Sequence, residues 1–299
     1  MVSLIYYLQM FWKQRVAHKK FNFHCKLDEK KRVLVIAPDI PHFFSLSIPA
    51  MYSLTHYFKK KPHLFIIEKD FEIFFRYFIK DSAVIENSKD KKKILEKINK
   101  MTDIDILFDL NYPESPWHKM VFTPELKIAV SDDEPANYNI VFHPITKNIE
   151  QMYSNLLTTF NVPITYPSLR ITKKEKARAW EFAKYHGHKE ENMLLFLDMS
   201  VKKFESLKQA LNRLNNGRVT LMDNSLTRML EIKEKLALLS ISDLFVSENS
   251  IFLWPARVFK VKTYLLRNEF NFLIREDKYL KRERKDPLKE MSQLVGTAK

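Results

Sequence analysis

Two short groups of side chains in this sequence are of the types that bind metal ions. His186 and His188 flank Gly187, and the run 132–134 consists of three consecutive acidic residues. Zinc sites in proteins use three or four nitrogen, sulfur or oxygen ligands from the chain. Two histidines with no third ligand nearby do not meet this requirement, so we expect His186 and His188 to be exposed turn residues. The acidic run is better explained as a surface loop, with a cation site as the alternative, and we predict no metal centre.

Cysteine and glycine are rare, which excludes several other kinds of site. Cys25 is the only cysteine, so the chain has neither an intramolecular disulfide nor a cysteine-based zinc site. This fits a reducing compartment, and we expect a cytoplasmic protein. Glycine occurs three times in 299 residues, where its usual share of about 7% would give about 21. The sequence has no Gly-rich phosphate loop or dinucleotide fingerprint, and we predict no resident cofactor.

The charge balance suggests an acidic partner. Lys and Arg number 50 against 36 Asp and Glu, a formal net charge of +14. Nucleic acid, anionic lipid and phosphorylated sugars are the candidate classes. No zinc finger, RNP signature or basic heptad region is present, so we do not expect sequence-specific binding of nucleic acid.

The first twenty residues suggest a contact with a membrane. Residues 1–11 are almost wholly apolar and aromatic, and basic residues follow as far as Lys20. A secretory signal would have its charges before the apolar run. We expect residues 1–20 to form an interfacial helix on an anionic membrane surface, at the inner membrane face. The alternative is a helix packed on the protein's own surface or on a partner subunit.

The rest of the chain alternates between buried-strand runs and helical patterns. In the first half the predicted strands are 32–38, 63–68, 83–85, 105–110, 127–130 and 139–141, and the predicted helices 47–61, 71–80, 90–101 and 147–160. In the second half the predicted strands are 193–199, 218–223, 243–248 and 261–266, and the predicted helices 173–186, 202–215, 225–239 and 252–258. Such alternation is typical of parallel sheets covered on both faces.

These elements predict an α/β protein with two doubly wound, Rossmann-like domains. The expected parts are an amphipathic, basic segment (1–30), an N-terminal domain (31–160), a Pro-containing extended linker (161–172), a C-terminal domain (173–267) and a charged, helix-prone tail (268–299). Ligands of such folds bind at the carboxyl ends of the strands, here facing a central cleft. Four phenylalanines at helical spacing in 71–78 are expected to be core or partner-facing residues.

Several blocks, in order and at matching separations, resemble the ADP-heptose:lipopolysaccharide heptosyltransferases of glycosyltransferase family nine. They are residues 32–51, 103–112, 161–172 and 241–266. The resemblance implies a GT-B fold. It also implies an acceptor-side N-terminal domain and a donor-side C-terminal domain that binds a nucleotide sugar.

The chain departs from this family at the position of the general base. The family has a Gly-Asp pair in its first loop, and this sequence has His42 and Phe43 there. Phenylalanine cannot accept a proton, and general-base catalysis contributes about 10²- to 10⁴-fold. Asp39 and His42 are the neighbouring residues that could take over as catalytic base.

The donor-binding motif departs as well. Where the family has D-S-G-P-M-H, this chain has Asn249, Ser250, Ile251, Phe252, Leu253 and Trp254. By resemblance Ser250 and Asn249, together with Ser200 and Lys202, would contact the donor phosphates. Ile251 and Trp254 would fill the cleft, and Ile251 would strain a left-handed turn. In addition, Asp198 places a carboxylate where a phosphate would bind.

We therefore expect a heptosyltransferase-like GT-B pseudoenzyme, a binding or assembly scaffold at the cytoplasmic membrane face with a protein partner. The alternative is an active, divergent glycosyltransferase that moves a sugar from a nucleotide sugar to an envelope glycolipid of the lipopolysaccharide core type. It would use Asp39 or His42 as base and Lys202 or Lys203 for charge compensation. A phosphate- or lipid-binding module without transferase ancestry is a third hypothesis.

Overall fold

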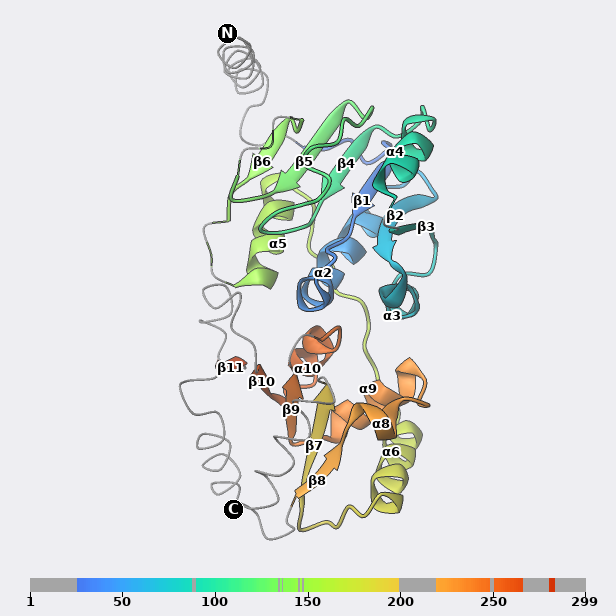
Figure 1. Cartoon of the computed structure of the whole chain (residues 1–299), viewed down its shortest axis with the longest axis vertical. Coiled ribbons are helices and arrows are strands. Elements are labelled where there is room, and N and C mark those ends of the chain that lie inside the picture. Colours follow the sequence, from blue (N-terminus) through green and yellow to red (C-terminus); the bar gives the residue numbers. More distant parts are fainter. Residues whose placement is uncertain are drawn as a thin grey trace. The chain divides into compact units, whose positions relative to one another are not determined.

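The computed structural model describes residues 26–87, 90–133, 135, 137–144, 146, 148–198, 219–247, 250–265 and 280–282 (Figure 1). Contacts divide the chain into two units, Met1–Pro167 and Ser168–Lys299. Each unit contains one parallel sheet, as the alternation of strands and helices predicts. No helix in the described ranges is both long and apolar enough to cross a membrane.

The first unit has a six-stranded sheet in the order β3-β2-β1-β4-β5-β6. All its neighbouring strands are parallel. The strands are β1 (Val33–Ile36), β2 (His63–Glu68), β3 (Ser82–Asn87), β4 (Ile106–Asp109), β5 (Leu126–Val130) and β6 (Ile140–Phe142). The chain starts at the central β1, builds outward to β3, and returns to β4 on the other side. The strand order therefore reverses between β1 and β4, the point at which doubly wound sheets bind ligands.

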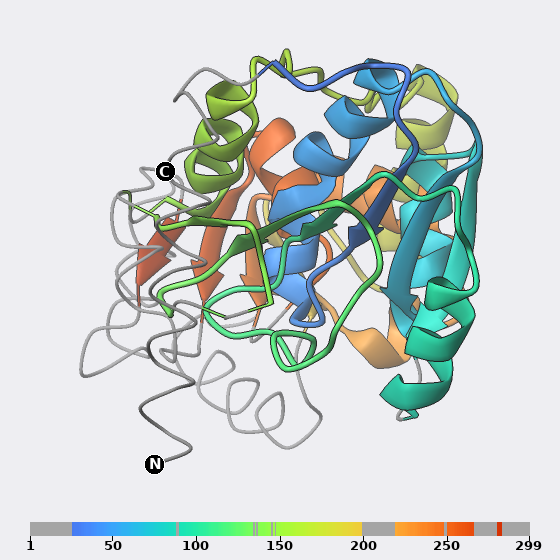
Figure 2. The same ribbon diagram turned by 90° about the horizontal axis from the view of Figure 1, so that it is seen from above.

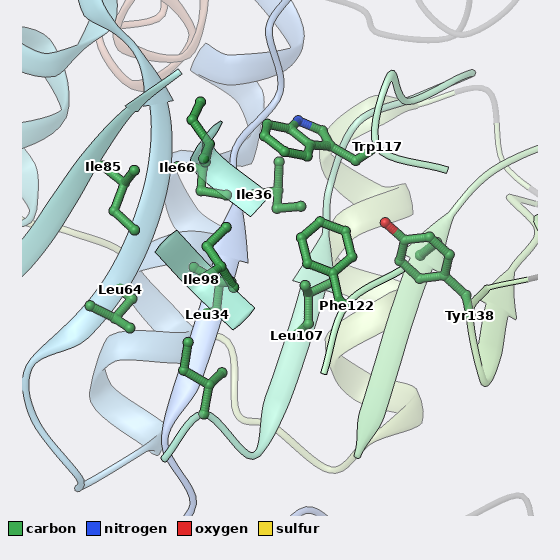
Figure 3. Close-up of a cluster of buried hydrophobic side chains, with 13 residues drawn as sticks. Leu34, Ile36, Leu64, Ile66, Ile85, Ile98, Leu107, Trp117, Phe122 and Tyr138 are labelled. Atoms are coloured by element: carbon green, nitrogen blue, oxygen red, sulfur yellow. The ribbon is translucent and has the colours of Figure 1, made fainter. Parts of the chain in front are cut away.

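The helices of this unit cover both faces of the sheet. They are α2 (Pro41–Tyr57), the short 3-10 helix η1 (Lys69–Phe71), α3 (Glu72–Phe78), α4 (Lys91–Asn99) and α5 (Ile149–Thr159). Successive strand residues point to opposite faces. On one face Leu34 and Ile66 pack with Ile98 of α4 and with Trp117 (Figure 3). On the other face, Phe65 contacts Phe75 of α3, so α4 lies opposite α3 (Figures 1 and 2).

The main departure from the predicted elements in this unit is the start of α2. The helix begins at Pro41, six positions before the predicted start at 47. Proline is suited to the first turn of a helix because its missing N–H has no intrahelical partner there. The four phenylalanines of 71–78 are buried, as expected for core residues. The segment 161–172 contains no helix or strand.

The second unit has a five-stranded parallel sheet in the order β11-β10-β9-β7-β8. The strands are β7 (Met193–Asp198), β8 (Val219–Met222), β9 (Leu244–Ser247), β10 (Lys262–Leu265) and β11 (Leu280–Arg282). The helices are α6 (Lys173–Tyr185), α8 (Asn224–Thr227), α9 (Ile232–Ile241) and α10 (Leu253–Val258). Gly187 follows α6 with a φ of 88°, which is the left-handed position that favours glycine at a helix end.

Two predicted helices of this unit are wrong in extent or type. The helix predicted at 225–239 is two helices, because Asp223 caps the first and Glu231 forms a capping box with Glu234 at the start of the second. In the tail predicted to be helix-prone, residues 280–282 form β11 at the edge of the sheet. The predicted helix 202–215 and the rest of the tail lie outside the described residues.

His188 is buried rather than exposed, which corrects its prediction as a turn residue on the surface. It is 5% exposed, and its Nδ1 lies 3.2 Å from Oγ1 of Thr220 on β8. Its ring also contacts Trp180 of α6, with the ring centroids 5.3 Å apart. His188 thus connects the end of α6 to the sheet, and burial lowers its pKa below the ordinary value of 6.5. His186 is half-buried.

The lowered pKa of His188 predicts acid sensitivity of the second unit. The unfolded state binds a proton near pH 6.5 and the folded state only at lower pH. The free energy of unfolding should therefore fall as the pH decreases from about 6.5 toward the folded-state pKa. His188→Gln should reduce this fall in urea titrations at several pH values, whereas His186→Gln should leave it unchanged. An unaltered pH profile in His188→Gln would contradict the assignment.

Candidate functional site

The polar residues of the first unit gather where its sheet reverses strand order. Asp39 lies in the loop after β1, and Asn111 lies in the loop after β4. The backbone N–H of Asp39 donates to Oδ1 of Asn111 at 3.0 Å. One hydrogen bond thus ties together the two loops that flank the switch point.

A buried carboxylate holds this link in place. Asp109, the last residue of β4, is 1% exposed. Its Oδ1 accepts from the backbone N–H and from Nδ2 of Asn111 at 3.1 and 2.9 Å. Its Oδ2 accepts from the Tyr138 hydroxyl at 2.8 Å, and Nε2 of His118 lies 3.9 Å away. Because Nδ2 of Asn111 donates to Asp109, its Oδ1 faces the amide of Asp39.

Burial and the carboxylate of Asp109 also shift the pKa values of two neighbouring side chains, Tyr138 and His118. The pKa of Tyr138 is raised, first by burial and then by Asp109, so its hydroxyl stays protonated and donates. The pKa of His118 is lowered by burial, against the opposing effect of Asp109.

A second polar group lies at the carboxyl ends of β2 and β3. Nδ2 of Asn87 donates to Oε1 of Glu68, and Nζ of Lys91 on α4 donates to Oδ1 of Asn87. Loss of hydration raises the pKa of Glu68 and lowers that of Lys91. Loss of hydration also raises the pKa of Asp39, with a smaller opposing effect of Lys91. The three charged groups therefore influence one another at one edge of the sheet.

The two predicted catalytic residues have different environments. Asp39 is an exposed residue at the switch point. His42 is buried in the first turn of α2, with its ring centroid 4.7 Å from that of Phe43. Phe43, at the position expected for the base, is 0% exposed and contacts the Tyr112 ring at 5.8 Å. Phe43 is therefore a core residue in this fold.

In the second unit, Asp198 and Ser250 meet at the carboxyl edge of the sheet. Asp198 ends β7, and Ser250 follows β9, the neighbouring strand. The Ser250 hydroxyl donates to Oδ2 of Asp198 and accepts from the Phe252 amide at 2.9 Å. Nδ2 of Asn224, at the start of α8, donates to Oδ1 of Asp198 at 3.0 Å.

The two residues predicted to fill the cleft are enclosed to different degrees. Trp254 on α10 is 2% exposed, and Ile251 is half-buried. The expected strain at Ile251 is wrong, because the non-glycine residues with positive φ in the described ranges are Asn161 and Lys260. The other predicted phosphate contacts, Ser200, Lys202 and Asn249, lie outside the described residues, as does Lys203.

Among the described residues, no group of three or more His, Cys, Asp or Glu side chains could hold a metal ion. Asp132 and Asp133 are exposed in the loop after β5, and Asp132 accepts from the Tyr112 hydroxyl at 2.7 Å.

Four residues of these polar groups were not predicted from the sequence, namely Asp109, Asn111, Glu68 and Lys91. A signal was available for three of them, since Asp109, Asn111 and Glu68 lie at or next to the carboxyl ends of predicted strands, where parallel sheets bind ligands. Nothing in the sequence separates Lys91 from its basic neighbours on the same helix.

The fold is similar to that of solved glycosyltransferases. A family 9 glycosyl transferase from Veillonella parvula DSM 2008 aligns over 92% of this chain and 92% of its own, with a TM-score of 0.58 and 12% identity. The heptosyltransferase WaaC of E. coli with ADP aligns over 89% of this chain and 97% of its own, with a TM-score of 0.55 and 12% identity. The E. coli ADP-heptose lps heptosyltransferase II aligns over 88% of this chain and 98% of its own, with a TM-score of 0.52 and 10% identity.

At this level of identity the similarity establishes the fold. The chain has a GT-B fold with two Rossmann-like domains, which confirms the predicted fold class. No protein-family model matches the sequence, and no curated protein sequence matches it.

The Asp109 network predicts a measurable cost for removing one hydroxyl. Tyr138→Phe deletes the donor to a buried carboxylate, and hydrogen bonds to charged groups contribute about 1.5–3 kcal/mol. We expect the free energy of unfolding to fall by this amount in urea titrations, and the Asp39 amide to exchange faster with deuterium. Tyr185→Phe, at a ring that is 86% exposed, is the control and should change stability by less than about 0.5 kcal/mol. Equal stability of the two variants would contradict the role of Asp109.

Proposed function

We propose that this protein is a heptosyltransferase-like pseudoenzyme, a GT-B scaffold that binds or assembles a partner without transferring a sugar. Residues 31–160 would form its acceptor-side domain and residues 173–267 its donor-side domain, joined by the linker 161–172. The fold is similar to that of glycosyltransferases. The step from fold to function rests on the chemistry of individual residues.

The contact between Ser250 and Asp198 carries the proposal. A serine hydroxyl has one proton to donate, and Ser250 donates it to Asp198. A phosphate oxygen at this edge would have to displace that carboxylate and would be repelled by its charge. The second carboxylate oxygen is held by Asn224, which keeps Asp198 in place. The edge that would receive a nucleotide diphosphate is thus occupied by an anionic group of the chain.

The surroundings of Phe43 support the same conclusion for the first unit. The expected base has been replaced by a side chain that is enclosed in the core and packed against Tyr112. A buried phenylalanine at this position can be exchanged for aspartate only by placing a charge inside the core. The Phe43 side chain is therefore part of the packing of α2 against the core.

Asp39 favours the alternative, an active glycosyltransferase with an envelope glycolipid as acceptor. Asp39 lies at the switch point, its backbone N–H is held by Asn111, and loss of hydration raises the pKa of its carboxyl toward the range of a general base. ADP-heptose donors, as in the name of the E. coli enzyme of similar fold, would then be the substrate class. His42 is less suited than Asp39 because it is buried.

Donor binding distinguishes the two functions. Calorimetric titration of the full chain with ADP-glucose and UDP-glucose should give no binding tighter than about 1 mM, and no nucleotide should be released on prolonged incubation. Asp198→Asn should bind ADP more tightly than the wild type, because it removes the opposing charge, and Asp133→Asn should not. Submillimolar binding by the wild type would refute the occupied donor edge. Donor hydrolysis that is lost in Asp39→Asn would establish the alternative.

We also propose that residues 1–20 bind an anionic membrane surface at its cytoplasmic face, which fits their aromatic and basic composition. Removing these residues should lower binding to phosphatidylglycerol vesicles at least tenfold in sedimentation assays, and binding by the full chain should weaken as salt is added. Equal binding of the full and shortened chains would instead favour a helix packed on protein.

A further inference from the structure

The carboxyl edge of the first sheet combines groups that a single kind of ligand could satisfy. We call Asp39, Glu68, Asn87, Lys91 and Trp117 the edge cluster. Asp39 follows β1, Glu68 ends β2, Asn87 ends β3, and Lys91 begins α4. The edge cluster therefore brings together residues from four elements at one end of a parallel sheet.

Lys91 lies among carboxylates without pairing directly with any of them. Its ammonium interacts electrostatically with Glu68 and Asp39. Yet none of the ion pairs formed by the described residues includes Lys91. Its hydrogen bond goes to the neutral side chain of Asn87. A ligand group that bridges Lys91 and the carboxylates must accept a hydrogen bond from the ammonium and donate hydrogen bonds to the carboxylates.

Trp117 provides a second, independent indication of a ligand. Its side chain is 0% exposed, and among the described residues no acceptor reaches its indole Nε1. The Lys91 ammonium lies 4.8 Å from the centre of its ring. Figure 3 shows the indole nitrogen on the edge of the ring that is turned away from Phe122. A buried donor without an acceptor costs free energy, and a ligand oxygen that reached this indole beside the Lys91 ammonium could satisfy it.

The charges of the edge cluster decide which ligands fit. With both carboxyls ionised, Asp39 and Glu68 outweigh Lys91, and Asp70 and Asp109 add to the negative potential at these carboxyls. A phosphate or carboxylate only accepts hydrogen bonds and would be repelled, whereas a hydroxyl both donates and accepts. Neighbouring hydroxyls on one ring could accept from Lys91 and donate to Glu68 and Asp39 together.

We propose that the edge cluster is a binding site for a neutral, hydroxyl-rich ligand, a sugar ring without acidic groups. The proposal deepens the proposed function, on which it rests for the acceptor-side role of the first domain. It names a neutral sugar as the ligand of that domain and excludes phosphorylated or acidic sugars from this edge.

The indole N–H signals of the four tryptophans, recorded by NMR on the full chain, test the proposal. Trp117→Phe identifies the signal of Trp117. Methyl glucoside and methyl galactoside should shift that signal saturably, while glucuronic acid and glucose 6-phosphate should bind at least tenfold more weakly. Absence of any shift by the neutral glycosides up to their solubility would overturn the proposal, as would equal or tighter binding of the acidic sugars.

Matched variants show whether the named residues bind the sugar. Lys91→Met keeps the aliphatic chain beside Trp117 and should lose at least tenfold in affinity, as should Glu68→Gln. Lys93→Met and Glu86→Gln change exposed neighbours on the same helix and strand and should bind like the wild type. Equal affinity in all four variants would overturn the site. Titration with nucleotide sugars tests the second domain. Binding of a nucleotide sugar there would refute the pseudoenzyme proposal and would leave the glycoside result for the first domain unchanged.

Discussion

The buried carboxylate of Asp109 is the interaction on which the carboxyl edge of the first sheet depends. A charge enclosed in a protein must be compensated by hydrogen bonds or by an opposite charge. Tyr138 and both nitrogens of Asn111 provide that compensation. By engaging Asn111 in this way, Asp109 fixes the amide oxygen that holds the loop after β1. The position of Asp39 and the entry into α2 therefore follow from one charged group at the end of β4.

The second domain uses a carboxylate at a strand end in the opposite way. Asp198 is half-buried, and it takes its hydrogen bonds from Ser250 and Asn224, two residues that face the carboxyl edge of the sheet. Asp109 therefore organises the loop that would receive a ligand, whereas Asp198 consumes the groups that would bind one. Under the proposed function, aspartates at the carboxyl ends of the two sheets thus have different roles, one supporting ligand binding by the first domain and one opposing nucleotide binding by the second.

Local patterns in the sequence were sufficient to predict the two α/β domains. The site was harder to predict because its contacts join residues that lie far apart in the sequence. The bounds of β2 match the predicted strand 63–68, because a buried parallel strand is a continuous apolar run. His188 was misjudged because its partner Thr220 lies 32 residues away. The bond from Asp39 to Asn111 spans 72 residues, and no periodicity reports it. The family resemblance located Phe43 and Ser250, but the burial of the first and the partner of the second required coordinates.

The net charge of +14 is a sum over the whole chain and does not give the local charge at the carboxyl edge of the first sheet. At the amino ends of the strands in the first domain, Lys31 and Lys60 pair with Asp105, so these two lysines lie at the end of the sheet opposite to the switch point. At the carboxyl ends, the carboxylates outnumber Lys91. The local potential that a ligand meets is set by groups within about a Debye length, not by the sum over the chain. A basic protein can therefore present an acidic edge, and the scarcity of phosphate-binding glycines agrees with that local sign.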